Sequence, residues 1–291
     1  MTKEMLTGQL EAILLNYDVT VPEATADNLR DLWLQFEPKS MAGIKAELRK
    51  QQETVGIPVP VLKSIGKGIG KNARRRVDDF LPLVQLLWNE YGREGRVVAV
   101  IPLGAMELVD PERIVPLLRD MCRTCLTWED ADRFAMDALE PIVRKKPEDW
   151  LHAVEPWLED ESKWVRRASV TVVGRLPMKR PEYAAHALVL IERLLHDDET
   201  DVKKAVSFAI RLAARGDTSA VHAFLSRHVP AEDPAATWVL CDAVRSMTKS
   251  YLPEFSDLLP LYEEWGADQS LSAKDRRSIE SAIKVLKKAT T

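Results

Sequence analysis

Apolar residues recur at three- and four-residue spacing along almost the whole chain. This spacing lines one face of a helix with apolar side chains, and two sets of positions show it most clearly. The sets are Val84, Leu87, Trp88 and Tyr91, and Ala131, Phe134, Ala135, Ala138 and Ile142. Proline, glycine and aspartate clusters such as Asp110-Pro111 and Gly216-Asp217 separate the segments. Because no alternating strand pattern of useful length interrupts them, the sequence predicts an all-α fold.

The polar positions contain an internal repeat. Residues 160–168 lie 37 residues before residues 197–205, and each segment has an acidic start, a valine, two basic residues and an alanine. One further step back, Trp128 and Ala131 keep their apolar places, while two acids replace the basic pair. An acidic N-cap followed by this pattern is typical of HEAT-like repeats, which stack helix pairs into an α–α superhelix. We therefore expect an α–α solenoid in which each acidic segment caps the next helix.

The composition is that of a folded protein kept in a reducing compartment. The chain has 291 residues, and its 46% hydrophobic content is sufficient for a continuous core. Its three cysteines are an odd number and no basic, apolar leader is present, so we expect a cytoplasmic location without disulfides. The apolar stretches are far shorter than a membrane span, so we expect no membrane association.

Two patterns that are typical of metal sites are incomplete. Cys122 and Cys125 have the two-residue gap of a metal or redox pair, but no second pair or histidine cluster accompanies them. The five histidines show no ligand spacing. We therefore expect buried structural thiols, no metal and no cofactor.

The charge is unevenly distributed along the chain. The net charge is −4, and residues 1–40 account for all of it with three basic and seven acidic side chains. Residues 63–76 contain six basic side chains and no acid: Lys63, Lys67, Lys71, Arg74, Arg75 and Arg76. Two interpretations stay open, a solvated helix end and loop or a surface that binds nucleic acid.

Residues 66–72 superficially resemble a phosphate-binding loop. Their glycine spacing is one residue short, and Asn72 replaces the hydroxyl residue that would hold magnesium. The segment also follows a helical pattern and not a strand. We therefore expect no nucleotide cofactor, and instead a frayed helix end that brings Lys67 and Lys71 close to a phosphate chain.

One tryptophan and one aspartate are candidates for chemistry. Trp128 and Asp132 are four residues apart, so they share one face of a helix. The core stripe of that helix leaves Asp132 on its flank, which in a solenoid faces the groove. Taken alone, this spacing is more typical of a structural or solvated pair than of a functional one. Arg167 is equally open, since a base on a helix surface is common.

Three motifs, with their order and spacing, resemble the AlkD family of DNA alkylation repair glycosylases. The motifs are residues 127–132 (TWEDAD), 164–168 (WVRRA) and 202–208 (VKKAVSF). Residues 56–63 (GIPVPVLK) resemble the entry segment of that family, and residues 86–88 and 94–99 resemble its next repeat. The resemblance covers about residues 44 to 247.

The resemblance assigns roles position by position. It implies that Asp132 is the catalytic aspartate, that Trp128 packs against the sugar of the lesion, and that Arg167 lies near the backbone beside it. Phe208 stands where the family more often has tryptophan, a departure that weakens the expected contact with deoxyribose. The DNA-binding positions that we predict are Lys63, Lys67, Lys71, Arg74, Arg166, Lys203, Lys204 and Phe208.

The resemblance implies a monomeric DNA glycosylase of base excision repair that acts on double-stranded DNA. It would release cationic N3- and N7-alkylated purines, bulky adducts included, without a deep base-flipping pocket. Two alternatives stay open: a non-catalytic HEAT-repeat protein that binds branched or distorted DNA, and a HEAT scaffold for protein partners. We divide the chain into an acidic helical extension (1–40), a catalytic region (41–247) and an additional helix pair of the same solenoid (248–291).

Overall fold

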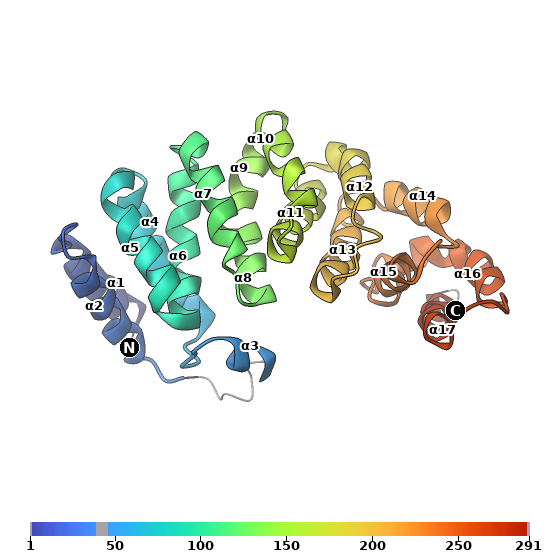
Figure 1. Ribbon diagram of the computed structural model, residues 1–291, viewed down its shortest axis with the longest axis horizontal. Coiled ribbons are helices and arrows are strands. Elements are labelled where there is room, and N and C mark those ends of the chain that lie inside the picture. The colour runs from blue at the N-terminus through green and yellow to red at the C-terminus, as the bar shows by residue number, and fades with distance from the viewer. Residues whose placement is uncertain (1, 39–45, 290–291) are drawn as a thin grey trace. The chain divides into compact units, whose positions relative to one another are not determined.

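The computed structural model describes residues 2–38 and 46–289. By their internal contacts these divide into two compact units, Met1–Ile142 and Val143–Thr291. No strand occurs in the described residues, and helices follow one another in pairs along the chain (Figure 1). The predicted all-α class of stacked helix pairs is confirmed. The predicted boundary between residues 40 and 41 lies outside the described residues.

The first unit is built around α4 and α6. Its helices are α1 (Lys3–Leu15), α2 (Pro22–Leu34), α3 (Ala46–Gln51), α4 (Val59–Ala73), α5 (Val77–Glu90), α6 (Gly92–Glu107), α7 (Pro111–Arg123), α8 (Trp128–Arg133) and the π-helix η2 (Phe134–Leu139). Helix α4 packs between α1 and α6, and α6 in turn contacts α8 and η2. Helices α2 and α5 pack on each other, and α7 packs on α6. Helix α6 therefore supports α8 and η2 from one side.

The second unit stacks four longer helices in succession. Its elements are α10 (Pro147–Val154), η3 (Glu155–Glu159), α11 (Lys163–Arg175), η4 (Leu176–Met178), η5 (Pro181–Tyr183), α12 (Ala184–Glu192), α13 (Thr200–Ala213), α14 (Thr218–His228), α15 (Pro234–Arg245), η6 (Leu252–Leu258), α16 (Leu259–Gly266) and α17 (Ala273–Ala289). Helix α9 (Glu140–Lys145) crosses the division between the units. Helix α13 packs between α11 and α15, and α15 packs on α17. Helices α12 and α14 and then η6 follow one another in the same way.

Side-chain bonds repeatedly join residues about one repeat apart. In the first unit, Trp88 Nε1 donates to Thr124 Oγ1 at 2.8 Å across 36 residues of sequence. In the second unit, Ser207 Oγ donates to Asp242 Oδ2 at 2.6 Å across 35 residues, and Lys163 Nζ donates to Asp201 Oδ2 at 3.0 Å across 38. Equivalent positions of consecutive repeats therefore touch, as the 37-residue period predicts.

The glycine-rich segment of residues 66–72 is not a frayed helix end, so that expectation is wrong. It lies inside α4, which is continuous from Val59 to Ala73. A Cβ atom added at Gly66 would lie 2.7 Å from the carbonyl oxygen of Val98, and one added at Gly70 would lie 3.3 Å from the Cβ atom of Ala105. The glycines therefore allow α4 to pack closely on α6.

The acidic segments of the repeat start turns and do not cap helices. Asp160 Oδ1 accepts the backbone N–H of Ser162, and Asp197 Oδ1 accepts that of Glu199, each at 2.9 Å. Helix α11 begins one residue after Ser162, and α13 one residue after Glu199. The two segments have the same geometry one period apart, so the repeat is confirmed while the capping role is corrected.

Candidate functional site

A capping box begins the short helix α8. Thr127 Oγ1 accepts the backbone N–H of Asp130 at 3.2 Å, and Asp130 Oδ2 accepts that of Thr127 at 3.2 Å. Asp130 Oδ2 also accepts the N–H of Leu126 at 3.0 Å. Because these bonds satisfy amides that a helix start leaves unpaired, they fix the first turn of the helix that carries Trp128 and Asp132.

Two buried arginines of α6 hold the same turn. Arg93 donates from Nε and Nη2 to the two carboxylate oxygens of Glu129, at 2.8 and 3.0 Å. Burial alone would raise the pKa of Glu129, but hydrogen bonds from Arg93 and Arg133 and their charges outweigh it and lower that pKa. Arg96 donates from Nη1 to Asp130 Oδ2 at 3.2 Å. Glu129 and Asp130, which stand where the other repeats have two basic residues, are thus both ion-pair partners of α6.

Arg96 also ties α8 to the preceding repeat. Its guanidinium lies over the Trp88 ring, 4.3 Å from the centroid, and donates to the Thr124 carbonyl at 3.1 Å. Gln52 Nε2 donates to Asp130 Oδ1 at 3.3 Å from the segment before α4. Helices α5 and α6 and this segment therefore converge on the start of α8.

Trp128 and Asp132 lie one turn apart on α8, and both are partly exposed. The π-helix η2 follows directly, and such segments occur frequently at functional sites. Helix α6 approaches η2 closely, because a Cβ atom added at Gly104 would lie 2.3 Å from the carbonyl oxygen of Asp137. A well-supported helix thus presents an indole and a carboxylate on one face.

Lys63 and Arg133 share one carboxylate beside this helix. Lys63 Nζ lies 2.7 Å from Asp137 Oδ1, and Arg133 Nη1 lies 3.5 Å from Asp137 Oδ2. Arg133 Nη2 also lies 3.2 Å from Glu129 Oε1. The predicted DNA-binding residue Lys63 is therefore already in an ion pair, with about a third of its side chain exposed.

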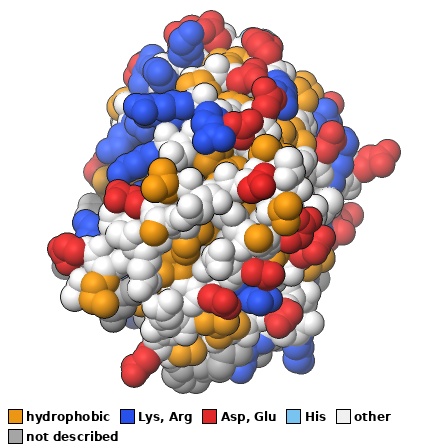
Figure 2. Space-filling view, turned by 90° about the vertical axis from the view of Figure 1, so that its left-hand side faces the viewer, with side chains coloured by type: hydrophobic (Ala, Val, Ile, Leu, Met, Phe, Trp, Pro, Cys, Tyr) orange, Lys and Arg blue, Asp and Glu red, His pale blue; other side chains and the backbone are white. Residues whose placement is uncertain are grey.

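The other basic side chains between residues 63 and 76 differ in whether they form an ion pair. Arg76 pairs with Asp79 at 2.6 Å. Four others are exposed and form no ion pair with any described residue: Lys67, Lys71, Arg74 and Arg75. They extend from the outer face of α4 into the loop that follows it. Figure 2 shows Lys and Arg side chains gathered in a patch at the upper left of the face that it presents.

The predicted arginines of α11 are engaged with the next repeat. Arg166 donates from Nε to Asp197 Oδ2 at 2.6 Å and from Nη1 to the carbonyl of Asp160 at 2.8 Å. Arg167 is buried, and its Nη1 donates to the backbone carbonyl of Asp201 at 2.5 Å. Arg166 therefore links α11 to the segment that leads into α13, and Arg167 links it to the first turn of α13.

Helix α13 carries the other predicted positions. Lys203 is partly exposed, and Lys204 is exposed. Phe208 is partly exposed, and the Arg211 guanidinium lies over its ring, 5.3 Å from the centroid. One face of the predicted second aromatic is thus covered by a cation of its own helix.

The cysteines are buried and form no disulfide. Burial raises the pKa of the Cys125 thiol well above its usual range, and raises that of Cys241 as well. The prediction of buried thiols is confirmed. No group of three or more histidine, cysteine, aspartate or glutamate side chains in the described ranges is placed to hold a metal ion. No helix within those ranges is both long and apolar enough to cross a membrane.

Comparison with known proteins identifies the family. The model of a family described as DNA alkylation repair enzyme matches residues 30–247, well over half of the chain. The chain belongs to this family. DNA repair is therefore its role, DNA its substrate, and all the predicted site residues fall inside the matched region. The chain matches no curated protein.

Solved structures add the fold of this DNA alkylation repair protein. The crystal structure of smu.31 from Streptococcus mutans UA159 is similar with a TM-score of 0.51 and 19% identity, covering 64% of this chain and 100% of that one. At this identity the likeness shows the fold alone. Two engineered proteins, each 12% identical, reach TM-scores of 0.34 and 0.35. The first match covers 84% of this chain and 96% of the engineered one, and the second covers 96% of this chain and 77% of the engineered one.

Sequence reasoning missed the residues that support the site of this DNA alkylation repair protein. Arg93 and Arg96 lie in the first turns of a helix that is apolar from Val97 to Met106, and charged side chains at the start of such a helix signal buried ion pairs. Outside this site, Trp238 was missed as well. It lies 74 residues after Trp164, two repeat periods, so the repeat register aligns these two tryptophans. Trp128 lies 36 residues before Trp164, one residue off that register.

Proposed function

We propose that this protein is a DNA glycosylase of base excision repair. It hydrolyses the N-glycosidic bond of purines that carry a positive charge after alkylation at N3 or N7, including bulky adducts. Asp132 is the catalytic carboxylate, and Trp128 contacts the sugar of the damaged nucleotide. The observation that carries the proposal is α8 itself: buried ion pairs and a capping box hold it, while Trp128 and Asp132 stay partly exposed on one face.

The chemistry needs one carboxylate and no general acid. When the glycosidic bond breaks, its electron pair moves to the cationic base, which leaves neutral. Positive charge then develops at C1′ of the sugar, and Asp132 stabilises it. Water adds to C1′, and its proton passes to Asp132 and then to solvent. The face of the Trp128 indole favours the cationic lesion and sugar by roughly 0.5 to 2 kcal/mol.

The cations of both units supply backbone contacts in this proposal. Exposed Lys67, Lys71 and Arg74 of the first unit have no carboxylate partner among the described residues, so they are available to phosphates. In the second unit, Lys203 and Lys204 have the same property. Arg167 is assigned a role beside the lesion's backbone, and its bond to the Asp201 carbonyl holds the guanidinium in place for it. A lesion held by backbone contacts needs no deep base-flipping pocket.

The test compares the wild type with Asp132→Asn. Both are incubated with duplex DNA that contains 7-methylguanine, and base release and binding are measured on the same preparations. We expect release to fall at least 100-fold with binding kept within about twofold, because loss of one preorganised electrostatic group costs about 10²–10³ in rate. Asp120→Asn on α7 is the matched control, since this carboxylate is exposed and pairs with Arg123 of the same helix at 2.9 Å.

Other outcomes favour the alternatives. Binding without release in the wild type would make the protein a non-catalytic binder of branched or distorted DNA. Neither binding nor release would favour a scaffold for protein partners, which the acidic residues 1–40 also fit. Release that Asp132→Asn retains would assign the chemistry to another residue.

A further inference from the structure

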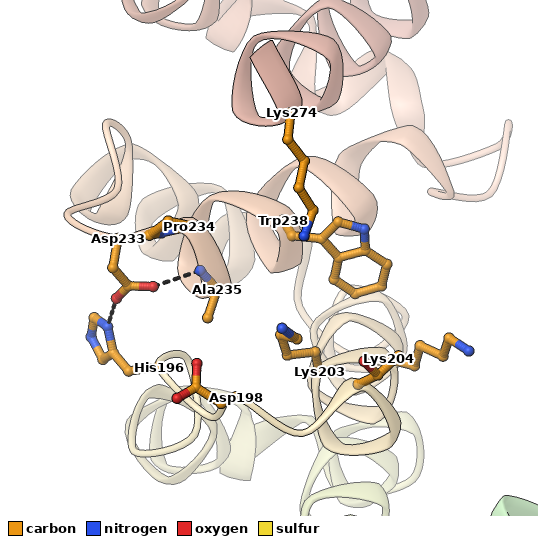
Figure 3. Close-up of a pocket in the computed structure, with 10 residues that line it drawn as sticks. His196, Asp198, Lys203, Lys204, Asp233, Pro234, Ala235, Trp238 and Lys274 are labelled. Atoms are coloured by element: carbon orange, nitrogen blue, oxygen red, sulfur yellow. Dashed lines mark hydrogen bonds and ion pairs between the residues drawn. The ribbon is translucent and has the colours of Figure 1, made fainter. Parts of the chain in front are cut away.

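A pocket of about 550 Å³ lies where the first turns of α13, α15 and α17 meet. Three lysines line it, Lys203 and Lys204 from α13 and Lys274 from α17, together with the indole of Trp238 from α15. In Figure 3, Lys274 reaches down to Trp238 from above, Lys203 lies below the indole, and Lys204 extends away to the right. The volume is within the range of small-ligand sites.

The lysines of this pocket lack the acidic partners that the preceding repeat has. On α11, Lys163 pairs with Asp201 and Glu199, at 3.0 and 3.7 Å. One period of 37 residues later, Trp238 stands in place of Asp201, and Ala236 in place of Glu199. Thr200 stands in place of Lys163 itself, and Lys203, Lys204 and Lys274 form no ion pair within the part of the chain that the structure describes.

The Arg166 pair is absent from the next repeat in the same way. Arg166 pairs with Asp197 at 2.6 Å, and the residue one period after Asp197 is Pro234. Lys203, one period after Arg166, therefore lacks the carboxylate that Arg166 has and forms no ion pair with a described residue. Where the repeat of α11 has ion pairs, the repeat of α13 therefore has an indole beside lysines that form no ion pair with a described residue.

Asp233, one of the two acids that line the pocket, already accepts hydrogen bonds from the start of α15. Asp233 accepts the backbone N–H groups of Ala235 and Ala236 at 2.7 and 2.9 Å and contacts His196. Burial alone would raise the pKa of Asp233, but these hydrogen bonds outweigh it and lower that pKa. Asp233 thus caps α15 and does not neutralise the lysines. Asp198 is exposed, and the three lysines outnumber the two aspartates, so the charged side chains that line the pocket have a positive balance.

We propose that this pocket binds an unpaired nucleotide of a DNA strand, with its phosphate on Lys203 and Lys274 and its base against Trp238. Cations recognise the phosphate, and an indole stacks on any base, so the site accepts a strand without reading its sequence. A base inside a duplex is stacked between its neighbours and cannot reach an indole. A strand end or a gap offers such a base.

The nucleotide in this pocket is distinct from the reacting one, because neither Trp128 nor Asp132 lines the pocket. Lys274 lies beyond the region that the family model matches, so α17 adds this contact. The inference rests on DNA being the substrate and not on the proposed glycosylase reaction. The two therefore fail independently.

The experiment measures binding of the full chain to a labelled oligothymidylate by fluorescence anisotropy. Trp238→Ala should weaken binding about tenfold or more, because base–aromatic stacking is removed, and Trp238→Phe should recover most of the affinity. Lys274→Gln should lower the slope of log affinity against log salt by about 0.7, the value for one phosphate of a single strand. Lys179→Gln is the control, since this lysine is exposed, lies in the same unit and is outside the pocket.

Three further measurements make the result decisive. Base release from 7-methylguanine duplex at saturating protein should be the same for Trp238→Ala and wild type, and Asp132→Asn should still bind the oligonucleotide. If free thymidine monophosphate competes at the same concentration as the oligonucleotide, the pocket is a small-molecule site and the strand proposal is overturned. An unchanged salt slope for Lys274→Gln also overturns it, even if Trp238→Ala does not fold.

Discussion

Glu107 carries a carboxyl group that is fully buried at the end of α6. Neither of its oxygens has a hydrogen-bond partner in the described part of the chain. Burial raises the pKa of Glu107 from 4.5 to about 10. The folded protein therefore holds this proton at neutral pH, whereas the unfolded chain releases it.

The raised pKa predicts a stability that falls as pH rises. Between about pH 4.5 and pH 10 the folded state binds one proton more than the unfolded state at this position, so this contribution to the free energy of unfolding decreases with pH. Glu107→Gln has no proton to lose, so it should remove the decrease. Urea unfolding of both proteins at pH 6 and pH 9 measures the difference.

The exposed Glu112→Gln variant on α7 is the control and should keep the wild-type dependence on pH. If Glu107→Gln loses as much stability between pH 6 and pH 9 as the wild type does, the group responsible lies elsewhere.

Asp132 shows what the sequence reveals about a single residue. Its spacing from Trp128 and its place beside the core stripe correctly predict a partly exposed carboxylate on one helix face. The pairing of Lys63 with Asp137 could not be predicted, because 74 residues of sequence separate the partners and the repeat pattern does not report which side chains meet across two periods. The burial of Arg167 was hidden in the same way, since its acceptor is a backbone carbonyl.

At the scale of elements, α8 depends on ion pairs supplied by α6. Arg93→Met should lower the free energy of unfolding by about 3 kcal/mol, because it strips a buried carboxylate, Glu129, of its main partner. Arg133 still reaches Glu129 at 3.2 Å, which holds the loss at the lower end of the range for broken buried pairs. Thermal and urea unfolding measure the change.

Two further variants distinguish the loss of a buried ion pair from the loss of a charge in general. Arg113→Met removes an exposed arginine paired with Asp78 at 2.5 Å and should cost less than about 1 kcal/mol. The double variant Arg93→Met, Glu129→Gln should recover part of the loss, since no unpaired buried carboxylate remains. If the double variant is no more stable than Arg93→Met alone, the arginine acts through packing.

Local sequence patterns did not predict two of the elements correctly. Glycines inside residues 66–72 suggest a frayed end, yet α4 continues, because close packing on α6 compensates for the low helix propensity of glycine. The π-helix η2 has no signal in its own sequence. Its form accompanies the close approach of Gly104 to Asp137, a contact between helices that periodicity does not report.

At the scale of the whole molecule, the repeat made the fold predictable. A single pair of matching segments gave the period, and bonds across 35, 36 and 38 residues recur in both units. The period did not predict which repeats keep their polar contacts. At Trp238 the acids of one repeat are replaced in the next, a difference that becomes visible only when the register is applied to α15.

The distribution of unpaired cations predicts how DNA binding responds to salt, although the net charge is −4. The triple variant Lys67→Gln, Lys71→Gln, Arg74→Gln should lower the slope of log affinity against log salt by about 0.9 for each phosphate that the protein no longer neutralises. Affinity should fall equally for duplexes with and without 7-methylguanine, because bonds to phosphate carry no information about the base. Titrations of labelled duplex between about 50 and 200 mM salt measure both quantities.

Arg30→Gln is the control for that variant. Arg30 is exposed but lies 3.3 Å from Asp27, so its charge is already compensated and its removal should leave the slope unchanged. If the triple variant keeps the wild-type slope, DNA does not contact the exposed face of α4, and the phosphate-binding side chains belong to the second unit alone. If it weakens only the duplex with 7-methylguanine, these side chains recognise the lesion and not the backbone.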